Sequence, residues 1–293
     1  ILILYNHLFS PMNPTTDDYK NFTKHKSIED LKDIRNVSYS PDGKLLAIST
    51  DGSLRVYDAL SGNISTVISL DINNFTHFTE NTILFLKDKE IKYLSLYDNK
   101  YLNIFQGHLN KINNIYASSL NDSFVTSSEQ DVNIWDIKSK NPIYHLKIKN
   151  AIGSFVDDRF LLASNSIVKI YDIRNINNCL KTIKIIQSDY QKIESCRDYF
   201  SISGNKMHQI YNKEGEFITP IKTVESSYVT FTPDTKHYTC SAGQFLIFND
   251  TTSKNKLFTM KDEANHFGNV LFNPCYLQFV STNEKLNFWM PGK

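Results

Sequence analysis

His108 and Glu129 are the residues whose types come closest to a catalytic pair in this 293-residue chain. An imidazole beside a carboxylate can act as a general base that the acid orients. The remainder of a catalytic site is missing from the sequence. There is no nucleophile elbow, no phosphate-binding glycine loop and no HExxH helix, and the chain has only 10 glycines. We therefore expect both residues to serve the fold.

Paired carboxylates and cysteines are the other candidates for chemistry. Asp157-Asp158 and Asp17-Asp18 fall at turn or tail positions, where solvated acidic residues are the ordinary outcome. The cysteines are scattered, with no CxxC pair and no histidine at metal-ligand spacing, so reduced structural thiols are expected. They are Cys179, Cys196, Cys240 and Cys275. We predict no catalytic residue, no cofactor and no metal site.

Charge and composition narrow the function further. The net charge is +1, from 32 basic and 31 acidic residues, so no bulk field favours nucleic acid or an anionic membrane. No stretch approaches the roughly 18 apolar residues that a membrane span needs. With 41% hydrophobic and 22% charged residues, the chain can bury a substantial core. We expect a globular protein with no sequence-specific nucleic-acid contact and no membrane partner.

A repeat of roughly 40 residues organises the chain. Seven short apolar segments each end in an aromatic or large aliphatic residue, and successive end residues lie 36 to 41 positions apart. These end residues are Tyr57, Leu94, Trp135, Tyr171, Tyr211, Phe248 and Trp289. Each unit alternates short apolar segments with Gly, Pro, Asn or Asp, which predicts four β-strands. A unit of this length that ends in Trp-Asp, or a worn version of it, is typical of WD repeats. The chain is therefore predicted to be all-β, a seven-bladed WD-repeat β-propeller.

A recurring turn supports the repeat. Ser40-Pro41-Asp42-Gly43 in blade one has Pro at its first central position and Gly at its end. Related turns recur at the same phase as Thr232-Pro233-Asp234-Thr235 in blade six and Asn273-Pro274 in blade seven. Three occurrences at one phase favour a true repeat.

The last unit predicts how the ring closes. Blade seven reaches its third strand at Trp289, and the sequence ends at Lys293. The fourth strand should therefore come from the N-terminus, around Tyr19 to Lys24, which would remove an open sheet edge.

The same count predicts the domain boundaries. We expect residues 1–18 to form an extension, partly disordered, and residues 19–293 to form a single propeller. Met12 is a candidate initiator, because the repeat needs nothing before about Tyr19.

The repeat also gives the possible catalytic pair a structural role. Regular WD repeats place an Asp six residues before the terminal aromatic, where its carboxylate accepts hydrogen bonds from turn amides and a nearby His. Glu129 holds this position relative to Trp135 in blade three, and Asp51 and Asp88 hold it in blades one and two. We expect His108, Glu129 and Trp135 to form a structural network inside blade three.

Blade four carries a possible docking motif. Tyr171-Asp172-Ile173-Arg174 matches the Trp/Tyr-Asp-x-Arg pattern by which some WD-repeat proteins bind cullin ubiquitin-ligase adaptors. The pattern is short and common at blade ends, so Asp172 and Arg174 also suit a purely structural role.

Blade two departs from ordinary WD repeats, because Leu94-Ser95 stands where Trp-Asp is usual. The run IKYLSLYDNKY, from Ile91 to Tyr101, is followed by Phe105-Gln106-Gly107-His108. It resembles blade two of one family, the WD-repeat subunit shared by the COMPASS histone-lysine methyltransferase complex and the nuclear cleavage-and-polyadenylation machinery. Supporting matches are Asp122-Ser123-Phe124, Val168 to Arg174, Ser227 to Asp234, Phe272-Asn273-Pro274 and Phe288 to Pro291. The resemblance weakens in blade five, Asp189 to Ile221.

The resemblance implies a non-enzymatic scaffold in the nucleus. Members of that family bind a segment of the SET-domain methyltransferase. Separately, they bind a polyadenylation and phosphatase scaffold that brings protein phosphatase-1 to RNA polymerase II, with a link to the phosphorylated C-terminal repeat of the polymerase. The blade-two run is the candidate partner surface, although its residues must also fill the blade core. Its members are Tyr93, Tyr97, Asp98, Asn99, Lys100 and Tyr101. A substrate receptor of a cullin-type ubiquitin ligase remains the alternative.

Overall fold

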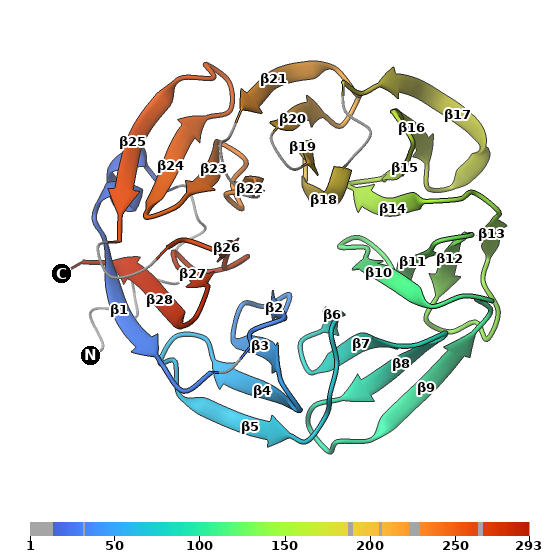
Figure 1. The fold of residues 1–293 in the computed structure, drawn as a ribbon, viewed down its shortest axis with the longest axis horizontal. Helices are drawn as coiled ribbons and strands as arrows, with labels where there is room; N and C mark the ends of the chain where they lie inside the picture. The colour runs from blue at the N-terminus through green and yellow to red at the C-terminus, as the bar shows by residue number, and fades with distance from the viewer. Residues whose placement is uncertain are drawn as a thin grey trace.

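Seven four-stranded antiparallel sheets surround a common centre in the described part of the chain (Figure 1). The computed structural model describes residues 14–31, 33–186, 190–204, 207–222, 229–262 and 266–292. Residues 1–13 of the predicted extension, Met12 among them, lie outside this description, as do Ser227 and Tyr228. The seven-bladed β-propeller predicted from the repeat is confirmed. No helix in the described ranges has the length and apolar character needed to cross a membrane.

Each blade runs from an innermost strand to an outermost one. Blade one contains β2 (Asn36–Tyr39), β3 (Leu45–Thr50), β4 (Ser53–Asp58) and β5 (Ile64–Ile68). Blade two contains β6 (Phe75–Thr79), β7 (Thr82–Lys87), β8 (Glu90–Ser95) and β9 (Tyr101–Gln106). Blade three contains β10 (Ile112–Ala117), β11 (Ser123–Ser128), β12 (Val132–Asp136) and β13 (Tyr144–Leu146). Blade four contains β14 (Ala151–Val156), β15 (Arg159–Ser164), β16 (Ile167–Asp172) and β17 (Asn175–Lys184).

The remaining blades follow the same order. Blade five, where the family resemblance weakens, contains β18 (Tyr190–Cys196), β19 (Tyr199–Gly204), β20 (Met207–Asn212) and β21 (Phe217–Lys222). Blade six contains β22 (Val229–Phe231), β23 (His237–Ala242), β24 (Phe245–Asp250) and β25 (Lys256–Lys261). Blade seven contains β26 (Asn269–Phe272), β27 (Phe279–Thr282), β28 (Leu286–Pro291) and β1 (Phe22–Ile28).

Alternation along the strands builds the core between blades. Successive side chains of a strand point to opposite faces of its sheet. In blade three, Phe124 and Trp135 pack against blade two, while Val125 and Ile134 pack against blade four. Both faces of the middle strands are therefore buried, which explains why the sequences of these strands consist almost entirely of apolar or small residues.

The recurring turns keep one geometry with different residues. Gly43 closes the blade-one turn at φ 71°, and a side chain there would collide with the Asn273 amide, because an added Cβ would lie 2.1 Å from its Oδ1. Thr235 occupies the same left-handed region at φ 61°, and its N–H donates to the Thr232 carbonyl at 2.9 Å. A β-branched residue is strained in this conformation, so the blade-six turn is formed at some cost in stability.

The N-terminal strand closes the ring, as predicted. β1 pairs antiparallel with β28, and Lys24 lies opposite Trp289 (Figure 1). The strand begins later than expected, at Phe22, because a short helix, α2 (Thr16–Lys20), precedes it. Thr15 and Asp18 form a capping box that starts this helix. Tyr19 therefore lies in the helix, buried against an aromatic cluster of blades six and seven, and α2 crosses the boundary expected at residue 18.

Two buried histidines predict how stability depends on pH. Burial lowers the pKa of His77, on β6, and of His208, on β20, from 6.5 to about 4. Between these values the unfolded chain binds more protons, so the free energy of unfolding should fall as the pH drops from 6.5 to 4. The expected loss is on the order of 3 kcal/mol for His77. Urea unfolding of the wild type and of His77→Gln at several pH values checks this. The variant should show a shallower dependence on pH, and parallel curves would contradict the assignment.

Candidate functional site

The imidazole of blade three belongs to a buried chain of hydrogen bonds. His108 Nδ1 lies 2.5 Å from Asp131 Oδ1, and His108 Nε2 lies 2.7 Å from Thr126 Oγ1. The indole N–H of Trp135 donates to the same Thr126 oxygen at 2.8 Å. The Ser128 hydroxyl also donates to Asp131. These contacts join the loop before blade three to its two central strands.

Burial favours the neutral form of the His108 ring. Burial is the largest influence on the pKa of His108 and lowers it, although the bond to Asp131 acts in the opposite direction. If Thr126 accepts from Trp135, its hydroxyl proton is available to His108 Nε2, and Nδ1–H then donates to Asp131. Both ring nitrogens are therefore used inside the protein, where the side chain has no exposed surface. This arrangement suits a structural role.

The carboxylate of the network is Asp131, whereas the sequence pointed to Glu129. Glu129 lies exposed at the tip of the turn between β11 and β12. Asp131 lies at the end of that turn and is buried. Two hydrogen bonds hold it there, because its carbonyl accepts from the Ser128 N–H at 2.8 Å and its own N–H donates to Ser128 Oγ at 3.2 Å. The sequence feature that could have identified this carboxylate is the presence of an Asp four residues before Trp135.

Asp51 and Asp88 lie in the corresponding turns of other blades. Asp51 is exposed, and its Oδ1 accepts from Arg35 Nη2 at 3.1 Å. Asp88 is exposed at φ 55°, and its carbonyl accepts from the Ile112 N–H at 2.8 Å. Asp51 thus contacts the segment that precedes its own blade. The Asp88 carbonyl contacts β10 of blade three, and Asp88 lines the same hollow as His108.

Five of the six candidate partner residues lie together at one exposed corner. We call the stretch from Tyr97 to Tyr101, which connects β8 to β9, the blade-two corner. Tyr97 is 90% exposed, Asn99 adopts φ 54°, and Lys100 Nζ lies 3.2 Å from Asp98 Oδ2. The ring of Tyr101 is half exposed, and Lys92 Nζ lies 5.4 Å from its centroid.

Tyr93 is separated from the blade-two corner. Its ring packs edge-on against Phe78, with 5.6 Å between centroids, and its phenol oxygen accepts from Thr82 Oγ1 at 3.2 Å. Tyr93 thus fills the interface between blades two and three.

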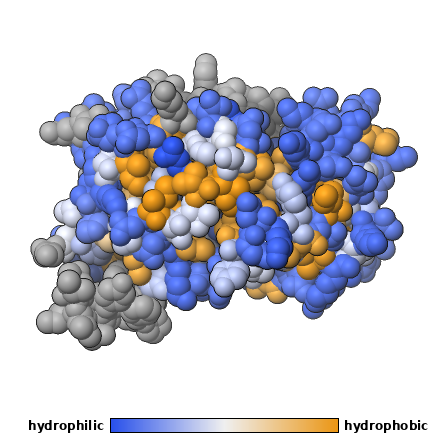
Figure 2. Space-filling model, turned by 90° about the horizontal axis from the view of Figure 1, so that it is seen from below, coloured by the Kyte–Doolittle hydropathy of each residue, from blue (hydrophilic) through white to orange (hydrophobic). Residues whose placement is uncertain are grey.

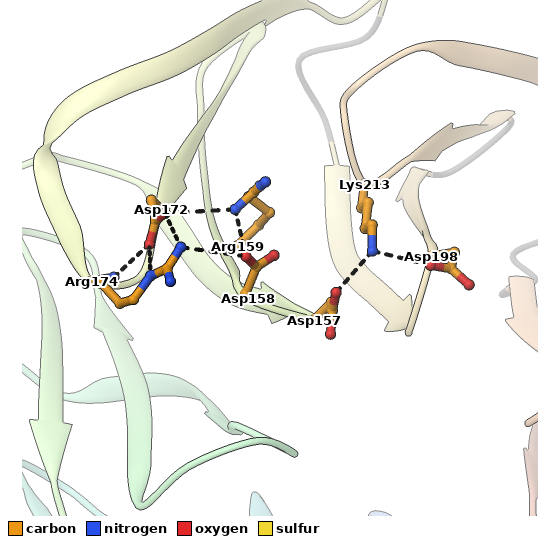
Figure 3. Close-up of polar contacts among 7 residues, drawn as sticks. All are labelled: Asp157, Asp158, Arg159, Asp172, Arg174, Asp198 and Lys213. Atoms are coloured by element: carbon orange, nitrogen blue, oxygen red, sulfur yellow. Dashed lines mark hydrogen bonds and ion pairs between the residues drawn. The ribbon is translucent and has the colours of Figure 1, made fainter.

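Asp172 and Arg174 form a closed pair at the end of blade four (Figure 3). Arg174 Nε donates to Asp172 Oδ1 at 2.9 Å, and Arg174 Nη2 donates to Oδ2 at 2.7 Å. These bonds hold the pKa of Asp172 well below its usual range. The Arg174 side chain is still 75% exposed, so its outer edge can reach another protein.

Basic side chains partner the paired carboxylates next to this motif (Figure 3). Arg159 Nη1 donates to Asp158 Oδ2 at 2.8 Å. Lys213 Nζ bridges Asp157, at 2.9 Å, and Asp198, at 3.3 Å. The bond to Lys213 lowers the pKa of Asp157. Within the ranges that the structure describes, no group of three or more His, Cys, Asp or Glu side chains could hold a metal ion.

Comparisons with known proteins agree with the architecture. Residues 19–58, which include the closing strand and most of blade one, match the family model described as "WD domain, G-beta repeat". The chain is 26% identical to WD repeat-containing protein 82 of Drosophila melanogaster, over 90% of this chain and 92% of that protein. It is 28% identical to Set1 complex component swd2 of Schizosaccharomyces pombe, over 37% of this chain and 33% of that protein. It is 27% identical to COMPASS component SWD2 of Saccharomyces cerevisiae, over 39% of this chain and 37% of that protein.

Proposed function

We propose that this chain, a WD-repeat protein similar to WD repeat-containing protein 82 and Swd2, is a non-enzymatic scaffold subunit of nuclear complexes. These complexes act in transcription-coupled histone lysine methylation and in mRNA 3′-end processing or transcription termination. The observation that carries the proposal is the similarity to WD repeat-containing protein 82 over nearly the whole chain. The partial matches to Set1 and COMPASS components supply the connection to histone methylation.

The arrangement of side chains supports a role in binding. His108 and Asp131, an imidazole beside a carboxylate, are buried and hydrogen-bonded within the blade, which supports a structural role for them. A propeller has two faces and a rim, and it can hold extended peptides on several surfaces at once. The blade-two corner is the exposed part of the run that distinguishes this propeller from ordinary WD repeats.

The proposed partners are protein segments. They are a segment of the SET-domain methyltransferase, a polyadenylation and phosphatase scaffold, and the phosphorylated C-terminal repeat of RNA polymerase II. The near-zero net charge gives no general attraction to nucleic acid or to anionic membranes, so neither is proposed as a partner. No cofactor is proposed.

Affinity purification from nuclei of the source organism tests the proposal. Methyltransferase or polyadenylation subunits should co-purify with the tagged wild type. Tyr97→Ala combined with Lys100→Glu should reduce this recovery about tenfold, the effect of roughly 1.4 kcal/mol of lost binding. Lys140→Glu, in the corresponding turn of blade three, is the matched control and should leave recovery unchanged. Absence of these subunits from the wild-type eluate would overturn the proposal.

The exposed guanidinium of Arg174 favours a second candidate, a substrate receptor of a cullin-type ubiquitin ligase. A binary binding assay with the cullin adaptor separates the two. If this candidate holds, the wild type binds the adaptor and Arg174→Ala loses binding, while Arg159→Ala retains it. Equal absence of binding in all three proteins eliminates the candidate.

A further inference from the structure

The outer strand of each blade presents a free edge whose backbone groups can pair with another chain. Proteins usually block such edges with lysine, with proline or by keeping the strand short. Five of the seven outer strands in the described ranges follow this rule. They are β1 with Lys24 and Lys26, β13 with three residues, β17 with Lys181 and Lys184, β21 with Pro220 and Lys222, and β25 with Lys256 and Lys261. β5 and β9 contain neither lysine nor proline.

β5 is guarded from outside by a lysine of the neighbouring strand. Lys26, on β1, reaches the start of β5, where its Nζ donates to the Gly62 carbonyl at 2.7 Å and to Asn63 Oδ1 at 2.9 Å. These contacts place the Lys26 ammonium at the turn between β4 and β5, beside the N-terminal end of β5. β9 is the outer strand that combines an uncharged sequence with an edge left open.

β9 presents aliphatic side chains at alternate positions. Leu102 is 52% exposed and Ile104 is 45% exposed. Figure 2 shows the rim that carries β5 and β9 in the lower part of Figure 1, with a larger apolar group toward β5 in the middle and a smaller one toward β9 at the right. The ladder with β8 has a bulge at Leu102, so Ile104 lies in the regular part of this edge and Leu102 at its irregular end. Alternate aliphatic side chains on a free edge suit an added strand.

The backbone of β9 is oriented for pairing. The Ile104 N–H donates to the side-chain oxygen of its neighbour Asn103 at 2.9 Å, so it is not used in the ladder with β8. Ile104 lies opposite Lys92 on β8, and in an antiparallel ladder the N–H and C=O of such a residue both point away from the partner strand. An incoming strand can replace the side-chain bond with a backbone bond.

A hollow with more basic than acidic side chains lies at the C-terminal end of β9. Its volume is about 500 Å³, and its lining includes Gln106 of β9, three lysines, Lys87, Lys89 and Lys92, and two carboxylates, Asp88 and Glu90. Lys92 lies 3.7 Å from Glu90. Among the described residues, no carboxylate lies within 4.0 Å of the ammonium groups of Lys87 and Lys89. This end of the strand therefore complements an acidic side chain.

We propose that β9 is a docking edge for an extended segment of a partner protein, which pairs with it as a fifth strand of blade two. The segment carries aliphatic residues two positions apart, which pack beside Leu102 and Ile104. It carries an acidic residue at the end that meets Lys87 and Lys89. This inference rests on the proposed scaffold function and names the chemistry of one partner segment.

Selection from a displayed library of random octapeptides on the full chain tests the docking edge. Enriched peptides should share two aliphatic residues at alternate positions and an acidic residue at one end. Dissociation constants of a fluorescent representative are then measured by anisotropy. Leu102→Lys with Ile104→Lys should weaken binding at least about tenfold. Ile64→Lys with Val67→Lys, the same change on exposed residues of β5, should leave it unchanged.

Two further measurements identify the mode of binding. Lys87→Glu with Lys89→Glu should weaken the acidic peptide and strengthen a version with lysine in place of the acidic residue. Two peptides should be compared, one N-methylated at the odd-numbered peptide bonds and one at the even-numbered bonds. One should lose binding and the other should keep it, because only alternate N–H groups of an added strand face β9. The melting temperature of each variant should lie within about 3 °C of the wild type, which shows that a change in affinity is not caused by unfolding.

Several outcomes overturn the docking edge. They are no enrichment, enriched peptides that keep their affinity for the β9 variant, or N-methylation effects that do not alternate. Failure of the docking edge is distinguishable from failure of the scaffold function. If methyltransferase subunits co-purify but β9 binds no peptide, only the docking edge fails. If β9 binds the peptides but no such subunit co-purifies, only the scaffold assignment fails.

Discussion

A chain that begins at Glu29, and so lacks α2 and β1, is expected to lose cooperative unfolding of the whole propeller. Removal of the segment before Glu29 deprives β28 of β1, the strand that pairs with it from Phe22 to Ile28. It also removes the buried side chains of Tyr19 and Phe22 from a cluster that joins blades six and seven. Loss of one large buried aromatic side chain costs about 3–5 kcal/mol. Two such losses and an exposed sheet edge approach the whole stability of an ordinary domain, about 5–15 kcal/mol.

Thermal unfolding followed by circular dichroism measures this effect. The matched control is a chain that begins at Pro14, which retains every described contact of α2 and β1 and should keep a single sharp transition. A midpoint for the chain beginning at Glu29 within about 3 °C of this control would show that the closing strand contributes little, contrary to the pairing in blade seven.

Asp131→Ala is expected to lower the free energy of unfolding by about 3 kcal/mol. The change removes the acceptor for two buried donors, the ring N–H of His108 and the hydroxyl of Ser128. Each buried donor left without a partner costs about 1–3 kcal/mol. Chemical unfolding in urea gives the difference directly, provided that the slope of the transition stays constant.

Glu129→Ala is the matched control for this prediction. Its side chain is exposed two residues away in the same turn, so its removal should change stability by less than about 0.5 kcal/mol. Equal effects of the two substitutions would contradict the assignment of Asp131 as the carboxylate of the network. Thr126→Val provides a second check, because it removes the hydroxyl shared by His108 and Trp135 while conserving the shape of the side chain.

The repeat period is enough to predict the blades, because every unit must bury both faces of its middle strands against two neighbours. Local chemistry decides details that the period does not. The closing strand begins at Phe22 instead of about Tyr19, since Thr15 and Asp18 cap a short helix first. That signal was present in the sequence as Thr-x-x-Asp.

The polar network shows where counting along the chain is insufficient. Position six before the aromatic selects Glu129, yet burial and the direction of the side chain select Asp131. A turn changes the direction of successive side chains within two residues, so a fixed offset cannot say which of them points inward. Tyr93 shows the same limit, because alternation along β8 turns it into a blade interface and away from the blade-two corner.

Ring closure by the first strand has a consequence for biosynthesis. Ser27 and Asn287, which share a hydrogen bond of 2.7 Å across the closing pair, are 260 positions apart in the chain. A ribosome releases β1 long before β28, so blade seven cannot assemble until β28 has been synthesised. Until then β1 offers an unpaired edge to other nascent polypeptides. The stability of the finished ring is thus linked to a period of exposure during synthesis, when chaperones would have to shield β1.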